Sequence, residues 1–208
     1  FAQWREEAWG RYANKTWRDF TLEGRPVGTL VSLRRAGYKT QVDDAWFNGW
    51  FQTLRTACGM YDFAKAEGRP EPARRAEAVL DLLLMAPRKE GAFPTVGRQE
   101  KEGWCWHPDN VWAGMKDCYH AYDMSWTAYW VLAFAERLPK RREECLTFCR
   151  GYADFLLARQ RPSGCIPSWY RQEDLEPIET FRDFNAETGA SALFLASCYQ
   201  ATGHTPYL

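Results

Sequence analysis

The stretch that decides the fold is residues 122–137, which read YDMSWTAYWVLAFAER. Apolar side chains cover nearly every side of the helix that this segment predicts, and such a helix must be buried. The next segment, 140–160, predicts a one-sided helix that buries Leu146, Phe148, Phe155 and Leu156 and exposes charged residues. A buried helix followed by a surface helix is the unit from which the fold is built.

The same unit recurs along the chain. Residues 45–67 and 71–86 predict another buried and surface pair, and residues 184–202 predict a third helix that is apolar on every side. The loops after the two surface helices also match, since GAFP at 91–94 resembles GCIP at 164–167. Alternation of buried and surface helices predicts concentric layers, with the inner helices shielded by the outer ones.

The N-terminal part is less regular. Residues 4–12 predict a short amphipathic helix, and residues 27–33 predict a strand or an extended arm. We therefore expect an N-terminal arm over 1–44 and helical hairpins over 45–208.

Composition limits the function classes. With 208 residues, 46% of them hydrophobic, the chain can form one domain with a substantial core. The formal net charge is zero, which argues against nucleic acid and anionic membranes as partners. No apolar run approaches the roughly 20 residues of a membrane span. The chain starts at Phe1 without a Met, so a missing signal peptide carries little weight.

The cysteines predict neither a disulfide framework nor a metal. Seven Cys leave at least one unpaired, and none shows C-x-x-C spacing. We expect a reducing compartment such as the cytoplasm, no structural zinc and no cofactor.

Aromatic residues are unusually frequent, with eleven Trp, ten Tyr and twelve Phe. Many stand in polar, loop-like stretches. Flat aromatic faces beside carboxylates suit the C–H faces of sugar rings, although a core rich in Trp is the simpler alternative.

Three stretches of the sequence resemble the six-hairpin glycosidase superfamily. They are DDAWFN at 43–48 with the following GAFPT, DMSWT at 123–127, and the segment from Asn185 to Leu208. The resemblance implies an all-α fold, an α/α toroid of helical hairpins, and a carbohydrate-processing site. Only about half of a six-hairpin ring would be present, so we expect a longer natural protein or other copies to close the ring.

Inner helices that alternate with outer ones all run in one direction, so their N-termini gather at one end. Polar residues that open these helices should then meet, although Asp and Asn are also common helix caps. Glycoside hydrolysis needs two carboxyl groups, and we expect Asp123 as one and Glu187 or Asp44 as the other. Other residues expected to bind substrate at this end are Asn48, His120, Tyr122, Trp126 and Asn185.

The loop 97–121 is the expected substrate platform, because its aromatic residues stand in a long, polar and irregular segment. The residues expected to bind sugar there are Trp104, Trp106, His107 and Trp112, and Trp169 could add a second stacking surface. These rings could instead hold the loop against the helices.

Three functions remain open from the sequence. The first is a glycoside or uronyl hydrolase that uses paired carboxylates on an oligosaccharide or polysaccharide. The second is a polysaccharide lyase or sugar epimerase, with a His/Tyr pair drawn from Tyr119, His120 and Tyr122 and a neutralising Arg34, Arg35 or Arg182. The third is a non-catalytic glycan-binding protein.

Overall fold

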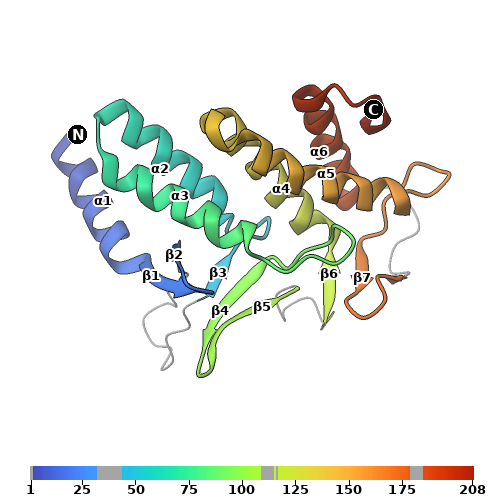
Figure 1. The fold of residues 1–208 in the computed structure, drawn as a ribbon, viewed down its shortest axis with the longest axis horizontal. Helices are drawn as coiled ribbons and strands as arrows, with labels where there is room; N and C mark the ends of the chain where they lie inside the picture. The colour runs from blue at the N-terminus through green and yellow to red at the C-terminus, as the bar shows by residue number, and fades with distance from the viewer. Residues whose placement is uncertain (1, 32–43, 109–114, 116, 179–184) are drawn as a thin grey trace.

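The computed structural model describes residues 2–31, 44–108, 115, 117–178 and 185–208 (Figure 1). The α-helices of these residues are α1 (Ala2–Thr16), α2 (Thr53–Glu67), α3 (Pro70–Leu84), α4 (Ala121–Arg137), α5 (Arg142–Arg159) and α6 (Ala186–Thr202). Short 3-10 turns cover Pro139–Arg141 and Thr205–Tyr207. The strands are β1 (Trp17–Leu22), β2 (Arg25–Leu30), β3 (Asp44–Trp46), β4 (Val96–Glu100), β5 (Gly103–His107), β6 (Cys118–His120), β7 (Trp169–Arg171) and β8 (Pro177–Ile178).

The prediction of an all-α toroid is wrong. The fold is mixed, with 55% of the described residues in helices and 20% in strands. The strands form three small antiparallel sheets, with the orders β1-β2, β3-β4-β5 and β6-β7-β8. Several of these strands are only two or three residues long, too short to show the alternating pattern by which a strand is recognised in a sequence.

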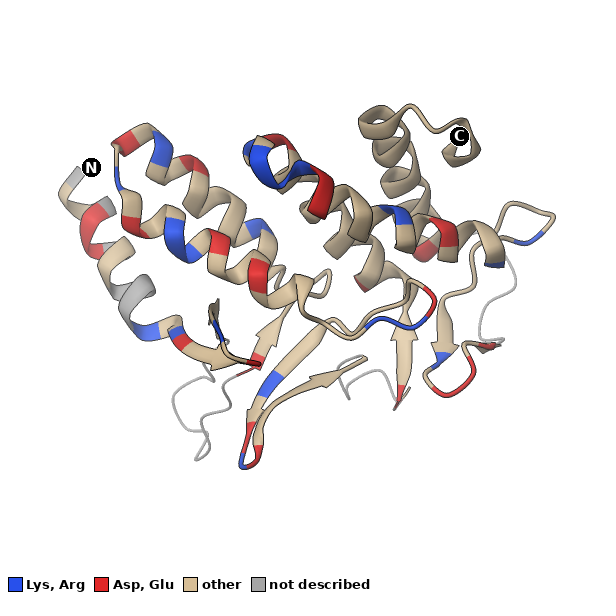
Figure 2. Cartoon of the chain, viewed as in Figure 1, with Lys and Arg blue, Asp and Glu red and all other residues tan. Residues whose placement is uncertain are grey.

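The predicted pairing of helices is present in the helical part of the fold. Helix α2 packs against α3, and α4 packs against α5, while α4 also contacts both α2 and α6. Charged residues are frequent on α2, α3 and α5 but nearly absent from α6 (Figure 2). The apolar helices α4 and α6 therefore pack against each other, and the more charged helices carry the surface.

Side-chain contacts show that α2, α4 and α6 run parallel. Between α2 and α4, Cys58 Sγ lies 3.9 Å from the Trp130 carbonyl, and the Tyr61 hydroxyl donates to the Arg137 carbonyl at 3.3 Å. Between α4 and α6, the residue before α4, His120, contacts Glu187 in the first turn of α6, and further along both helices the hydroxyls of Ser125 and Ser191 are 3.0 Å apart. Three helices with one direction bring their N-terminal ends to the same side of the molecule.

Two of the sheets lie at that side, below the helices in Figure 1. Strand β6 leads directly into α4 and pairs with β7, so that His120 lies opposite Trp169. Strand β3 precedes α2 and pairs with β4, with Asp44 opposite Arg98. Each of these two sheets therefore holds in place a segment that leads into a helix, β3 into α2 and β6 into α4.

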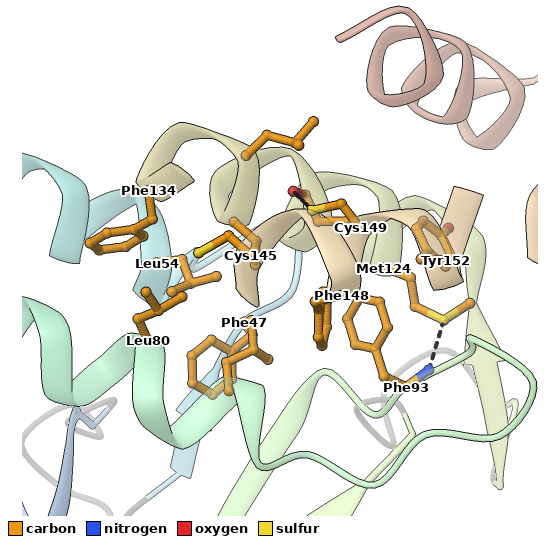
Figure 3. Packing of buried hydrophobic residues seen from close by; sticks show 14 of the residues in the cluster. Phe47, Leu54, Leu80, Phe93, Met124, Phe134, Cys145, Phe148, Cys149 and Tyr152 are labelled. Carbon is orange, nitrogen blue, oxygen red and sulfur yellow. Dashed lines mark hydrogen bonds between the residues drawn. The ribbon is translucent and has the colours of Figure 1, made fainter. Parts of the chain in front are cut away.

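One hydrophobic core joins the N-terminal segment and the helices. Figure 3 shows part of it, including Phe93, whose backbone N–H lies 3.5 Å from Met124 Sδ. Trp17, Val27 and Leu30, from the segment expected to be an arm, are buried in the same core. The predicted helix at 4–12 lies within α1, and the predicted strand at 27–33 overlaps β2.

Two boundaries differ from the sequence-based expectation. Helix α2 begins at Thr53 rather than at 45, because residues 44–46 form β3 and a turn follows. The segment 97–121, expected to be an irregular loop, contains β4, β5 and β6. Regular strands therefore hold most of its described residues.

A network of buried hydroxyls ties α4, α5 and α6 together near their shared end. Ser125 Oγ lies 2.8 Å from the Tyr152 hydroxyl and 3.0 Å from Ser191 Oγ. Tyr152 also donates to the carbonyl of Ala121 at 3.0 Å. Burial raises the pKa of Tyr152 well above its usual value, so the phenol stays protonated and donates.

We expect Tyr152→Phe to lower the free energy of unfolding by about 1–3 kcal/mol, because it leaves buried partners without their hydrogen bonds. Urea unfolding measures the change. Tyr129→Phe, at a half-buried tyrosine of α4, is the control and should change stability by less than about 0.5 kcal/mol. Equal effects of the two substitutions would contradict a structural role for the network.

Candidate acid–base site at the N-termini of the parallel helices

The imidazole of His120 connects two carboxylates that are far apart in the sequence. Its Nδ1 lies 2.9 Å from Asp123 Oδ2, and its Nε2 lies 3.1 Å from Glu187 Oε1. His120 is the last residue of β6, Asp123 stands in the first turn of α4, and Glu187 stands in the first turn of α6. Two of the three predicted catalytic carboxylates therefore meet, on opposite sides of one ring.

Glu187 is the only charged residue between Ala186 and Thr202, the whole length of α6. A lone acid in a first turn is favoured by the helix dipole. The cap of α6 is a different residue, however, since the Asn185 side chain accepts from Thr188 N at 3.0 Å. Glu187 is thus not the N-cap residue of α6, and its carboxylate contacts a histidine on another element.

Asp123 is fixed from both of its oxygens. Oδ2 faces His120, and Oδ1 accepts a hydrogen bond from the backbone N–H of Gly49 at 2.7 Å. Its side chain is 4% exposed, compared with 14% for Glu187. Asp123 therefore suits the role of orienting the ring, and Glu187 is the more accessible carboxylate.

The two contacts of His120 limit where the protons of the cluster can be. Ionised carboxylates can only accept hydrogen bonds, and a neutral imidazole has only one N–H to donate. Two hydrogen bonds from one ring to two carboxylates require either an imidazolium or a proton on one carboxyl group. The hydrogen bond with His120 lowers the pKa of Glu187, and this outweighs the opposing effect of burial. The ionised form of Glu187 is therefore favoured, and its carboxylate accepts a hydrogen bond from the imidazole.

Aromatic rings hold the imidazole in place. The indole of Trp169 stacks on His120 with the ring centroids 3.9 Å apart and the planes at 6°. The ring of Tyr122 is also near the imidazole, with its centroid 5.9 Å from that of His120. Trp169 is itself buried, so its ring supports the histidine rather than offering an open stacking surface as the sequence predicted.

Asp44, the third predicted catalytic carboxylate, takes part in a different interaction. Arg98 donates to both of its oxygens, at 2.7 and 3.0 Å, across the β3–β4 pair. Asp44 is buried and also faces Trp46 Nε1 at 3.3 Å. Its contacts are those of a structural ion pair between strands.

Three other predicted polar residues have structural partners. Asn48 is fully buried, and its Oδ1 accepts from the backbone N–H groups of Trp50 and Phe51, at 3.2 Å each. Asn185 caps α6 and donates to Ser168 Oγ at 2.9 Å. Tyr119 is buried, and burial raises its pKa. It precedes His120 in β6, so its side chain points to the other face of the sheet.

The aromatic residues of the expected platform pack against the core. Trp104 stacks on Phe20 with centroids 4.8 Å apart, and Trp106 packs against Phe47 at 5.8 Å. His107 faces Glu100 at 3.0 Å. The simpler alternative, that these rings hold the segment to the core, accounts for Trp104 and Trp106.

Trp112 and the arginines Arg34, Arg35 and Arg182 lie outside the described residues. Trp126 is half-buried on α4, with its ring 6.3 Å from that of Tyr122. Trp126 therefore stands beside the cluster, whereas Trp104 and Trp106 belong to another sheet.

Two aromatic side chains at this end belong to the segment 45–67, which the sequence predicted as a buried helix. Trp50 is 81% exposed and Phe51 is 54% exposed, in the turn before α2. The dipeptide Asn48-Gly49 was the signal that could have placed a turn here. Gly49 is also the residue whose N–H holds Asp123, so this turn belongs to the site.

Neither the family models nor the curated proteins contain a match for this chain. The resemblance to six-hairpin glycosidases remains a prediction. In the described part of the chain, no three His, Cys, Asp or Glu side chains gather as a metal would need. No helix there has the length and apolar character to cross a bilayer.

We expect Gly49→Ala to disturb the cluster, because the backbone at Gly49 leaves no room for a side chain. A Cβ there would lie 2.9 Å from Tyr122 Cδ1, closer still to Cε1, and 3.3 Å from Asp123 Oδ1. The variant should lose about 1–3 kcal/mol in urea unfolding as the Tyr122 ring is displaced.

Gly59→Ala is the matched control, since no atom lies within 4 Å of its added Cβ inside α2. It should raise stability by up to about 1 kcal/mol, because alanine favours a helix over glycine. Equal stability of the two variants would contradict the close packing of Tyr122 on Gly49.

Proposed function

We propose that this chain forms a carbohydrate-active enzyme site in which His120 and Glu187 transfer protons and Asp123 orients the histidine. The observation that carries the proposal is the single imidazole held between two carboxylates from different parallel helices. Histidine and carboxylate side chains held within hydrogen-bond distance of each other are the usual components of general acid–base catalysis.

The accessible part of the cluster is the His120–Glu187 contact. Asp123 has both oxygens engaged and is nearly fully buried. Proton transfer to Glu187 would neutralise its charge and leave a carboxylic acid, and the reverse transfer would restore the ionised base. One pair of residues could in this way supply both an acid and a base.

This arrangement favours proton abstraction over the paired-carboxylate mechanism. In a glycoside hydrolase the two carboxyl groups face each other across the scissile bond. Here the space between Asp123 and Glu187 is occupied by the imidazole ring. A lyase or an epimerase needs a base beside a sugar C–H bond, and the ionised Glu187 would be that base, with its contact His120 and the nearby Tyr122 as proton carriers.

A glycoside or uronyl hydrolase is the second candidate. The lowered pKa of Glu187 favours it, because an ionised carboxylate can act as a base or a nucleophile. In this mechanism the His120 proton would serve the leaving oxygen. Support for a sugar substrate comes from the exposed aromatic rings of Trp50 and Phe51 next to the cluster.

We expect Glu187→Gln and His120→Gln each to lower turnover by about 10²–10⁴-fold on any glycan that the chain processes. Polysaccharides and oligosaccharides with neutral and uronic sugars are the substrates to test. Ultraviolet absorption by a new C=C bond reports a lyase, reducing ends report a hydrolase, and exchange of a sugar C–H with deuterated water reports an epimerase.

Asp62→Asn is the matched control, because Asp62 pairs with Arg137 at the opposite end of α2 and α4. It should leave turnover within about twofold of the unaltered chain, as expected for a surface ion pair. Glycan binding without turnover, unaffected by Glu187→Gln, would favour the binding-protein alternative. No binding and no turnover on any glycan would overturn the proposal.

A further inference from the structure

The turn at residues 48–52 presents an indole to solvent beside the acid–base cluster. Trp50 is 81% exposed, whereas Trp104, Trp106, Trp126 and Trp169 are all half-buried or buried. The neighbouring Gly49 donates its N–H to Asp123. Consecutive Cα atoms are only about 3.8 Å apart, so the backbone of Trp50 lies directly next to the cluster.

This exposure does not come from a loosely held loop. Asn48 is fully buried, and its side-chain oxygen binds the N–H groups of both Trp50 and Phe51. Its carbonyl accepts from Gln52 N at 3.0 Å. Thr53 Oγ1 donates to the Trp46 carbonyl at 2.7 Å, which closes the turn. The backbone is fixed on both sides, so the fold sets the point at which the indole leaves the main chain.

A contact between two aromatic rings also holds the turn in place. Phe51 packs edge-to-face on Trp46, with the ring centroids 4.6 Å apart. Gln52 adopts a positive φ of 24°, which is strained for a residue with a side chain. Such strain persists only where the surroundings hold it, and it commonly accompanies binding sites. The turn therefore keeps Trp50 exposed at a cost in stability.

We infer that Trp50 is the stacking platform of a sugar-binding subsite next to the Asp123–His120–Glu187 cluster. The ligand is a pyranose ring of an oligosaccharide that presents a face of C–H bonds. This inference rests on the proposed function and names how the substrate is held. The flat apolar face of an indole complements such a sugar face, and its Nε1–H can donate to a hydroxyl.

The polar character of the turn agrees with a sugar ligand. Residues 48–52 read NGWFQ and contain no charged side chain. The turn contacts the cluster through Gly49 and Asp123, and the more accessible carboxylate of the cluster, Glu187, can accept hydrogen bonds from hydroxyl groups. An uncharged ligand with many hydroxyl groups and an apolar ring face therefore fits this surface.

The test is titration of the whole chain with cellohexaose, xylohexaose and hexagalacturonate, observed through the indole N–H signals in NMR spectra. Trp50→Phe identifies the Trp50 signal by its loss. We expect one of these probes to shift that signal, and Trp50→Ala to weaken its affinity about tenfold. Trp50→Phe keeps a flat ring and should recover part of the affinity.

Trp4→Ala is the matched control, since Trp4 is also a largely exposed tryptophan, 68% exposed, but stands on α1. It should leave the affinity within about twofold. If a probe binds and Trp50→Ala weakens it no more than Trp4→Ala, the subsite is overturned while the proposed function stands.

Glu187→Gln also distinguishes the Trp50 subsite from the proposed acid–base function. It should retain the Trp50 shift and lose turnover, because the platform binds and the cluster reacts. A Trp50 signal that none of the three probes shifts would overturn the subsite. Turnover lost in Glu187→Gln would still support the proposed function in that case.

Discussion

The common direction of α2, α4 and α6 is the constraint on which the site depends. Because the three helices run parallel, Gly49, Asp123 and Glu187 come to one side of the molecule although they are widely separated in the sequence. Parallel packing follows from the chain path, since α3 and α5 return the chain to the starting side after α2 and α4. Without that return, the first turns of α4 and α6 would lie at opposite ends of the core.

Helix capping explains some of the polar residues at this end and not others. Asn48 and Asn185 use their side-chain oxygens on nearby backbone N–H groups, as caps do. Asp123 and Glu187 instead point their carboxylates at the ring of His120, where β6 runs into α4. Burying the charge of a carboxylate beside a histidine costs desolvation free energy. An uncharged asparagine cap does not carry this cost. That difference is why the carboxylates carry the functional proposal and the asparagines do not.

The sequence predicted the helices well and the sheets hardly at all. The 3.6-residue period located α3, α4, α5 and α6 to within about two residues, because each buries a long apolar stripe. Strands β3, β6, β7 and β8 have three residues or fewer, so no period could identify them. The tryptophans of β5 were expected in a loop because they stand in a polar segment, but they pack against Phe20 and Phe47. The site could be predicted only as far as helix direction allowed. The convergence of Asp123 and Glu187 followed from helix order, but the pairing of Asp44 with Arg98 depends on strand register.

The central claim is that His120 and Glu187 act as one unit, and a double-mutant cycle tests it most directly. The free energy of unfolding at pH 7 is measured for the unaltered chain, His120→Gln, Glu187→Gln and the double variant. The account predicts that the two single effects are not additive, with a coupling of at least about 1 kcal/mol, as expected for a half-buried hydrogen bond to a charged group. Effects that add to within about 0.3 kcal/mol would contradict it, because residues in contact rarely behave so independently.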